Sequence, residues 1–505
     1  MIGQRFAAVV LVLAAITGLV MGVRAQPAPG QRPGYEIAWA TFVGGSAWDQ
    51  LREVIPFPDG SVLVAGLIKS AGLPTTAGAV QGEYAGDDPA LGHGGIYGGD
   101  AYLLRLSADG TKRVAATYFG GSKQERGVYG MDLDAAGRIV IAGATRSPDL
   151  PTTEGAYQQR YGGGRSDVFA ARLSADMTEL EWCTYVGGSG EDWPRGGLAL
   201  GPHGEVVIVG NDDSPNFVTT PGALEGAGGA AGDAMVLTLS ADGAQLLMAA
   251  RVGGSASDGV MGARVGPGGA IYLGGHTQSP DLSVTPNTPQ PLYASKSDCW
   301  LACLAPDGSR LVYSTYLGGS ENEFAEHRPW LGTDGSLLLT GVTQSPDFPT
   351  TPGAVQRSLR GRNDGFLVKL APGGDRLEFC TLLGGSEGEF FLMPTPDPDG
   401  NILIVGQTSS IDFPVTPDAL QPRYGGGPSD GVLALLSPDG SRVLYASYLG
   451  GSGEDMVRST ALGGEGTIWL VGSTSSRDFP VSAAVVQPDL GGDVDGFVVK
   501  LVPTR

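Results

Sequence analysis

Residues 384–452 read GGSEGEFFLMPTPDPDGNILIVGQTSSIDFPVTPDALQPRYGGGPSDGVLALLSPDGSRVLYASYLGGS, and they hold one complete copy of a repeated unit. Each copy begins with a Gly-Gly-Ser triplet. The first glycines of these triplets are Gly44, Gly120, Gly187, Gly253, Gly318, Gly384 and Gly450, at intervals of 76, 67, 66, 65, 66 and 66 residues. Self-similarity at a nearly fixed period indicates a repeat architecture with one supersecondary unit in each repeat.

Each unit predicts four short strands separated by turn residues. In the quoted copy the first strand follows the triplet and ends at the turn 397–400, and the second is the apolar run 401–405. A long polar segment then leads to the third strand, which starts at an Asp, and an Asp-Gly turn leads to the fourth strand, 443–449. Four antiparallel strands in each of seven units predict an all-β, seven-bladed β-propeller.

The two ends of the repeat region predict how the ring closes. The seventh unit stops at residues 501–505, after its third strand, whereas residues 35–43 (YEIAWATFV) precede the first triplet and match the fourth strands. Pairing this N-terminal strand into the last blade would close the ring and protect both edges. An open solenoid is the alternative, and it would leave those edges exposed.

The composition agrees with this fold and disfavours several others. Glycine accounts for 83 of the 505 residues, which a helical bundle or a coiled coil would not tolerate. The hydrophobic fraction of 41% is enough to build a large core, so disorder is not expected. The formal net charge of −21 disfavours nucleic acids and anionic lipids as partners, and it is compatible with cations or cationic partners.

The N-terminus predicts export. Arg5 precedes the apolar run 6–20, and Val-Arg-Ala at 23–25 resembles a cleavage site. We therefore expect a signal peptide at 1–25, a linker at 26–34 and a single propeller at 35–505; an uncleaved membrane anchor is the alternative. The mature chain is expected to be a monomer in the periplasm, on the cell surface or outside the cell, without membrane insertion.

The four cysteines are predicted to be unpaired and mostly buried. Cys299 and Cys303 lie four residues apart in one predicted strand, which is too far for a disulfide between them. Cys183 and Cys380 occupy the same position in units three repeats apart. The spacing also shows no CxxC or Cys/His metal motif.

The repeat motifs resemble those of the bacterial SBBP (seven-bladed beta-propeller) repeat family. The local matches are Thr-Tyr-Leu-Gly-Gly-Ser at 315–320, Thr-Gln-Ser-Pro-Asp-Phe-Pro-Thr-Thr-Pro-Gly-Ala at 343–354 and Ala-Pro-Asp-Gly-Ser at 305–309. The resemblance covers residues 35–505. It implies a secreted or cell-surface bacterial protein, and it carries over no catalytic residues because the family has none generally assigned.

Two acidic positions recur in every unit. The third residue after each triplet is acidic: Asp49, Glu125, Asp192, Asp258, Glu323, Glu389 and Asp455. The third strand always opens with an aspartate: Asp100, Asp167, Asp233, Asp298, Asp364, Asp430 and Asp495. Because both positions fall near one face of the propeller, the first set is a candidate Ca²⁺ site, and no other cofactor is predicted. We favour the alternative that these side chains hold backbone amides in every blade.

Three further positions recur. A serine follows the second strand, and in five units an aspartate comes two residues later. The glycine that closes the second strand, such as Gly406, predicts a β-bulge or close packing. Thr-Pro-Gly-Ala, as at 351–354, predicts a single helical turn within the long segment.

The best candidates for a specific site are residues that break the repeat. The fifth unit carries Glu326, His327 and Arg328 in its predicted channel-lining first strand. A histidine between two charges is a weak candidate for a general base, and we favour a salt-bridged channel wall. Three arginines, each three residues after an acidic position, are expected to neutralise carboxylates at the channel mouth: Arg52, Arg195 and Arg458.

No recognisable catalytic set is present in the sequence. The four histidines lie in different contexts, and no phosphate-binding loop occurs, because the glycine pairs precede a serine and an acid with no lysine. The glycine-rich insertion 87–99 could cover the face with the long loops or contact a partner, but we favour the alternative that it is a mobile surface loop. We predict a non-catalytic binding or scaffold module that contacts a protein or polysaccharide through that face. The alternative is a carbohydrate-active enzyme, a hydrolase or lyase that uses carboxylates there.

Overall fold

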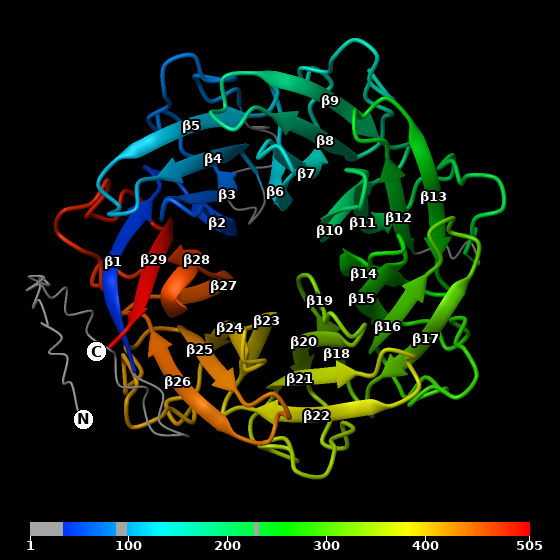
Figure 1. Ribbon diagram of the computed structural model, residues 1–505, viewed down its shortest axis with the longest axis vertical. Helices are drawn as coiled ribbons and strands as arrows, with labels where there is room; N and C mark the ends of the chain where they lie inside the picture. The colour runs from blue at the N-terminus through cyan, green and yellow to red at the C-terminus, as the bar shows by residue number, and fades with distance from the viewer. Residues whose placement is uncertain (1–33, 87–97, 227–231, 505) are drawn as a thin grey trace, which may run out of the picture. The chain divides into compact units, whose positions relative to one another are not determined.

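The computed structural model describes residues 34–86, 98–226 and 232–504. These residues form seven antiparallel sheets arranged as blades around a central axis (Figure 1). The predicted all-β, seven-bladed β-propeller is therefore confirmed. The predicted signal peptide, nearly all of the linker and most of the insertion 87–99 lie outside the described residues.

The strands follow the repeat, innermost strand first. Blades 1 to 3 are β2 (Asp49–Pro56), β3 (Val62–Ile68), β4 (Asp100–Leu106) and β5 (Arg113–Phe119); β6 (Glu125–Leu133), β7 (Ile139–Thr145), β8 (Asp167–Leu173) and β9 (Leu180–Val186); and β10 (Asp192–Leu200), β11 (Val206–Asp212), β12 (Asp233–Leu239) and β13 (Leu246–Val252).

Blades 4 and 5 are β14 (Asp258–Val265), β15 (Ile271–Thr277), β16 (Asp298–Leu304) and β17 (Leu311–Leu317); and β18 (Glu323–Ala325), β19 (Trp330–Leu331), β20 (Leu337–Thr343), β21 (Asp364–Leu370) and β22 (Leu377–Leu383). Blade 6 is β23 (Glu389–Pro396), β24 (Ile402–Thr408), β25 (Asp430–Leu436) and β26 (Val443–Leu449). Blade 7 is β27 (Asp455–Leu462), β28 (Ile468–Thr474), β29 (Asp495–Pro503) and β1 (Tyr35–Val43), with the short 3-10 helix η2 (Gly464–Gly466) between β27 and β28.

The ring closes as predicted, because the N-terminal strand β1 pairs antiparallel with β29 and becomes the fourth strand of blade 7. The register runs from Tyr35 opposite Pro503 to Val43 opposite Gly496. In Figure 1 the blue β1 lies beside the red β29. The two ends of the propeller are thus held together by a strand ladder, in which β1 takes the outermost position of blade 7.

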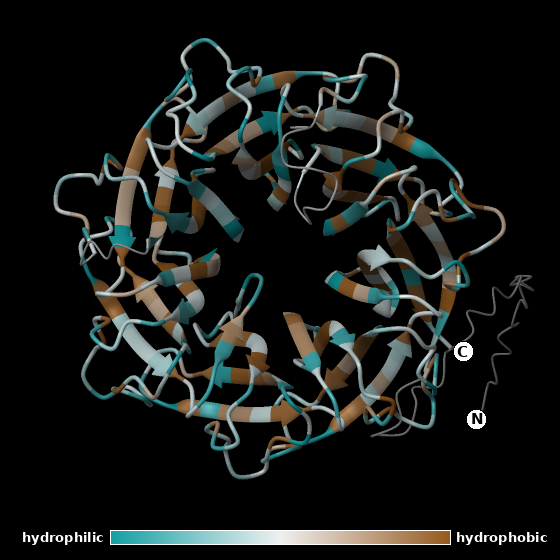
Figure 2. Ribbon diagram, turned by 180° about the vertical axis from the view of Figure 1, so that it is seen from behind, coloured by the Kyte–Doolittle hydropathy of each residue, from teal (hydrophilic) through white to brown (hydrophobic). Residues whose placement is uncertain are grey.

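The core lies within and between the blades, where the strands are hydrophobic while the connecting loops are more polar (Figure 2). Trp39 shows how neighbouring blades interlock: a Cβ atom on Gly110, in a turn of blade 1, would lie 2.6 Å from the Trp39 ring. The indole Nε1 also donates to the carbonyl oxygen of Ala108 at 2.9 Å.

The four cysteines are buried and free: Cys183, Cys299, Cys303 and Cys380.

The long segments between the second and third strands form the outer rim rather than a face. Thr351 N–H donates to Cys380 O at 3.0 Å, which joins the segment to the fourth strand of its own blade. Val80 N–H donates to Met177 O at 2.9 Å, which joins blade 1 to blade 2. In Figure 1 the segments lie outside the outermost strands. They start and end at the predicted face but cover the edge strands along the circumference.

The predicted helical turn at Thr-Pro-Gly-Ala is wrong. Residues 351–354 form a β-turn, in which Ala354 N–H donates to Thr351 O at 3.2 Å. Gly353 has a φ of +89°, a backbone conformation that a helix excludes and a type II turn requires at its third position. Within the described residues, no helix is both long and apolar enough to cross a membrane.

Candidate functional site

The two predicted sets of acids meet across the blade interfaces. Asp364 on β21 and Glu389 on β23 lie on either side of Gly384: a Cβ atom on this glycine would be 2.4 Å from Glu389 Oε2 and 2.6 Å from Asp364 Oδ1. We call these pairs the interblade carboxylate pairs. The other six are Asp495 with Asp49, Asp100 with Glu125, Asp167 with Asp192, Asp233 with Asp258, Asp298 with Glu323, and Asp430 with Asp455. Close approach to both carboxylates explains why the triplet begins with glycine.

The first-strand acid of each pair accepts hydrogen bonds from groups of its own blade. Asp49 Oδ2 accepts hydrogen bonds from Gly45 N–H at 2.7 Å and from Ser70 Oγ at 2.6 Å. Its Oδ1 accepts from Lys69 N–H at 2.9 Å and from Ser70 N–H at 3.1 Å. The carboxylate therefore ties the Gly-Gly turn to the end of the second strand.

The third-strand aspartate uses one oxygen in the same way. Asp430 Oδ2 accepts from Gly425 N–H at 2.6 Å and from Gln421 Nε2 at 3.1 Å. Its Oδ1 has no hydrogen-bond partner among the described residues. Burial raises the pKa of Asp430 to about 6, and the neighbouring charge of Asp455 acts in the same direction. The unbonded oxygen therefore favours the protonated form of the pair.

The third recurring acid holds the serine of the triplet. Asp412 Oδ1 accepts from Ser386 N–H at 2.8 Å and from Ser386 Oγ at 2.9 Å. Across the described ranges, no group of three or more His, Cys, Asp or Glu side chains is placed to hold a metal ion. The repeated acids therefore bind turns and join blades through backbone amides and hydroxyls.

A β-bulge in the first strand aims one side chain of a blade at the channel. Gly66 lies opposite Leu51, and the register shifts between Leu51 and Glu53, so Arg52 is the extra residue. A Cβ atom on Gly66 would be 2.0 Å from Gln50 O, which confirms the predicted bulge with close packing. The first strands of blades 2, 3, 4 and 7 have a register shift at the same place, and the residues that lie within these shifts include Tyr129, Arg195, Met261 and Arg458.

Blade 5 replaces the bulge with a break in its first strand. Residues 326–329, between β18 and β19, form a channel-crossing segment, so the prediction that they belong to a strand is wrong. His327 has a φ of +62°, which is incompatible with a strand, and Pro329 has no N–H to donate. Cβ atoms on Gly196 and Gly262 would lie 3.2 Å from His327 Cα and 2.5 Å from Arg328 Cα, which places the segment against blades 3 and 4.

Arg328 joins the channel-crossing segment to the first strands of blades 1 and 2. Its Nη2 pairs with Glu53 Oε2 at 2.6 Å, and its Nη1 donates to Met131 O at 3.3 Å. Arg264 Nε donates to Pro329 O at 3.1 Å. Burial raises the pKa of Glu53 to about 6, against the opposing effect of the Arg328 charge. Sequence reasoning missed Glu53, because a strand pattern does not show which residue faces another across the ring.

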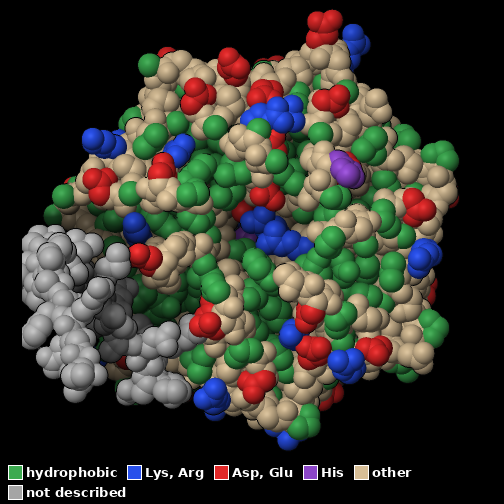
Figure 3. Space-filling model, viewed as in Figure 1, with side chains coloured by type: hydrophobic (Ala, Val, Ile, Leu, Met, Phe, Trp, Pro, Cys, Tyr) green, Lys and Arg blue, Asp and Glu red, His purple; other side chains and the backbone are tan. Residues whose placement is uncertain are grey.

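A cavity of about 120 Å³ lies on the propeller axis, and we call it the axial pocket. Its lining includes Arg52, Tyr129, Arg195, Glu326, His327 and Arg458. Figure 3 shows Lys or Arg side chains gathered in the central hollow of the visible face. The fold thus brings the three predicted arginines together with two of the three residues of the predicted Glu-His-Arg group.

The sequence predicts that all three arginines neutralise carboxylates, but two of them make other contacts. Arg52 Nε donates to Gln50 Oε1 at 3.0 Å, and its guanidinium lies 4.5 Å from the centre of the Tyr129 ring. Arg195 lies 4.2 Å from the centre of the Trp193 ring. Arg52 and Arg195 are thus held by an amide and by aromatic rings rather than by carboxylates.

His327 is an unusual histidine at the wall of the axial pocket. Its side chain is buried, and neither ring nitrogen has a hydrogen-bond partner among the described residues. Burial lowers its pKa well below the ordinary value, and the charges of Arg52, Arg458 and Arg328 add to this effect. The ring is therefore neutral near pH 7, and it is a weak base.

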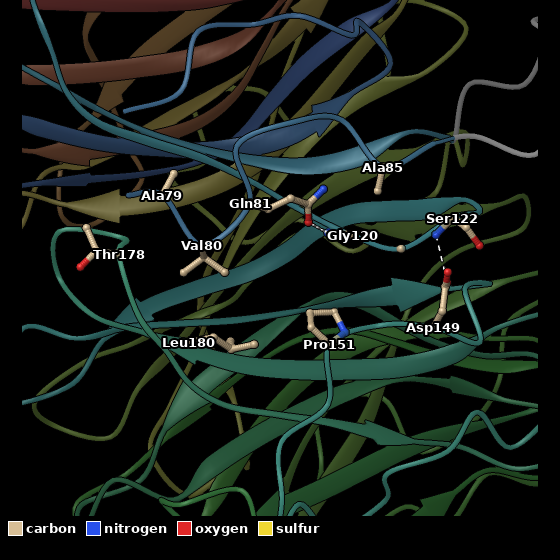
Figure 4. A pocket seen from close by; sticks show the side chains of 11 residues that line it. Ala79, Val80, Gln81, Ala85, Gly120, Ser122, Asp149, Pro151, Thr178 and Leu180 are labelled. Atoms are coloured by element: carbon tan, nitrogen blue, oxygen red, sulfur yellow. Dashed lines mark hydrogen bonds between the residues drawn. The ribbon is translucent and has the colours of Figure 1, made fainter. Parts of the chain in front are cut away.

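A second hollow lies on the rim between blades 1 and 2 (Figure 4), and we call it the rim groove. Its volume is about 540 Å³. Val80, Gln81 and Ala85 of the long segment line one side, and Pro151 and Leu180 of blade 2 line the other. Small and apolar side chains dominate this lining, and Asp149 within it accepts the N–H of Ser122 at 3.0 Å.

Neither a family model nor a curated protein matches the chain. Among solved structures, it is similar to a protein of unknown function from Dyadobacter fermentans (13% identity, 94% of this chain and 100% of the other, TM-score 0.41). It is also similar to BamB from Moraxella catarrhalis (11%, 92% and 99%, 0.36) and to a quinohemoprotein alcohol dehydrogenase from Comamonas testosteroni (8%, 94% and 77%, 0.40). Likenesses this distant carry no argument about function, and membership in the SBBP family stays a prediction from the repeat motifs.

Proposed function

We propose that this chain is an exported, non-catalytic binding or scaffold propeller that contacts a protein or polysaccharide partner through its rim. The observation that carries the proposal is the bonding of the repeated acids. In Asp49, Asp430 and Asp412 alike, carboxylate oxygens accept hydrogen bonds from amides and hydroxyls of the surrounding turns. Carboxylates engaged in this way stabilise loops and are poorly suited to act as a general acid and base pair.

The rim groove is the proposed contact. It is open to a partner and offers apolar side chains, such as Val80 and Leu180, beside polar groups of the Gly-Gly-Ser turn. A rigid groove of this kind costs little conformational entropy on binding, since hydrogen bonds already hold both of its walls.

The purified protein should be screened on a glycan array and by crosslinking to extracts, with product analysis for every glycan that it retains. We expect a partner that is bound and left intact. Cleavage products would contradict the proposal and would favour the carbohydrate-active enzyme.

A pair of matched variants locates the contact. Ala85→Arg places a long cation in the rim groove, and we expect it to weaken partner binding at least tenfold. Ala294→Arg is the control, because Ala294 is the exposed residue at the equivalent position of blade 4: both N–H groups donate to the third-strand aspartate, at 2.7 and 2.8 Å. Equal effects of the two variants would contradict a contact at the groove between blades 1 and 2.

A further inference from the structure

The axial pocket has the opposite charge to the rest of the protein. The chain carries a formal net charge of −21. Within the pocket, three guanidinium groups from blades 1, 3 and 7 face a single carboxylate, that of Glu326. Guanidinium groups that line one pocket repel one another, and an anion between them would reduce this repulsion.

Two of the three guanidinium groups, those of Arg52 and Arg195, are held in place before any ligand arrives. Tyr129 and Trp193 provide flat surfaces for Arg52 and Arg195, and Gln50 accepts a hydrogen bond from Arg52. Arginine presents donors in a planar fork that matches the oxygens of carboxylate, phosphate and sulfate. Because Arg52 and Arg195 are already ordered, these two side chains lose little rotamer entropy when such a group binds.

His327 supplies a second, independent sign of a ligand. It is 5% exposed, it lines the pocket, and both of its ring nitrogens lack a partner among the described residues. A buried polar group left without a hydrogen bond is destabilising. A neutral imidazole carries one N–H, which an anion in the pocket could accept. The Arg328–Glu53 ion pair holds the segment that presents this ring.

The size of the pocket limits what it can hold. Its 120 Å³ is several times the roughly 30 Å³ that one water molecule occupies in the liquid. It is well below the ~300 Å³ at which pockets for drug-sized ligands begin. We propose that the axial pocket binds one small oxygen-bearing anion, a carboxylate, phosphate or sulfate group, through Arg52, Arg195, Arg458 and His327.

This site adds a ligand to the proposed function and does not depend on the rim groove. The anion can be a free ion or the acidic group of a larger molecule such as a uronic acid. Isothermal titration calorimetry with inorganic phosphate, sulfate and glucuronate, at an ionic strength kept constant with sodium chloride, separates these sources. We expect saturable binding of at least one of them with a stoichiometry of one.

Two variants should change the affinity in opposite directions. Arg195→Gln removes one guanidinium and should weaken binding at least tenfold, which corresponds to about 1.4 kcal/mol. Glu326→Gln removes the opposing carboxylate and should strengthen binding several-fold. Arg423→Gln, at an exposed position of a long segment, is the matched control and should leave the affinity unchanged.

Circular dichroism checks that each variant is folded, and Arg52→Gln replaces Arg195→Gln if the latter unfolds. The proposal is overturned if the wild-type protein shows no saturable binding of the three anions up to about 10 mM. It is equally overturned if the arginine and glutamate variants bind as the wild type does. Loss of the partner at the rim groove, in contrast, would affect only the proposed function.

Discussion

The interblade carboxylate pairs concentrate negative charge and recur around the ring, whereas the axial pocket concentrates positive charge at a single place. The pairs are anionic, occur at every blade interface and bind turn amides, as Asp49 does with Gly45. The axial pocket is cationic and occurs once, where arginines of three blades meet a broken strand of a fourth. The repeated residues stabilise the blade interfaces, whereas the proposed ligand site is formed by residues that differ from blade to blade. Four predictions test that contrast, and they are ordered from the largest expected effect to the smallest.

Arg328→Ala should cause the largest loss of stability. It leaves Glu53, which is 1% exposed, as a buried charge without its cation, and breaking such a pair costs about 3–5 kcal/mol. Urea unfolding measures the loss. The double variant Arg328→Ala/Glu53→Gln should recover part of it, because it removes the stranded charge. A loss below about 1 kcal/mol would mean that the pair does not hold the channel-crossing segment.

Gly384→Ala should destabilise the protein by about 1–3 kcal/mol, the usual cost of overpacking. Its Cβ atom would come within 2.6 Å of both carboxylates of one pair. Gly268→Ala is the matched control, since a Cβ atom there meets nothing within 4 Å. If both variants unfold at the same urea concentration, close approach does not explain the glycine of the triplet.

Stability should fall as the pH rises from 5 to 8. Burial raises the pKa of Asp167 to about 7 and the pKa values of Asp298, Asp430 and Asp495 to about 6. A carboxyl with a raised pKa binds its proton more tightly in the folded state, so its contribution is complete below the unfolded pKa and is lost as the pH passes the folded pKa. We expect the free energy of unfolding to fall by more than ~2 kcal/mol, because tenfold tighter proton binding corresponds to about 1.4 kcal/mol. A higher melting temperature at pH 8 than at pH 5 would contradict this expectation.

Asp430→Asn should have the smallest effect, and it should depend on pH. The amide oxygen can still accept from Gly425, while the NH₂ group can donate to Asp455 where the acid would need a proton. We expect a gain of about 1 kcal/mol at pH 8 and none at pH 5. Asp489→Asn, at an exposed aspartate, is the control. The Ca²⁺ interpretation concerns the first set of acids, such as Asp455, and predicts instead a calcium-dependent rise in the melting temperature of the wild type.

Much of the fold could be predicted because the same short sequence signals recur in every blade. The triplets mark the period, the N-terminal strand replaces a missing fourth strand, and glycines such as Gly66 mark the bulges. Local patterns mislead where the tertiary structure imposes another backbone conformation. The turn 351–354 has the proline of a helix start, but Gly353 adopts a positive φ. The sequence predicts a strand over 326–329 because every other unit has one there.

The sequence by itself determined the ring, its closure and the places where acids recur, since these depend on short-range patterns that occur seven times. Only the tertiary structure decided which acids face each other across blades and which residues meet on the axis. Arg52 and His327 lie 275 positions apart in the chain, and they line one pocket because seven blades converge there. A contact made across a ring depends on closure of the whole molecule, and no local pattern of residues records it.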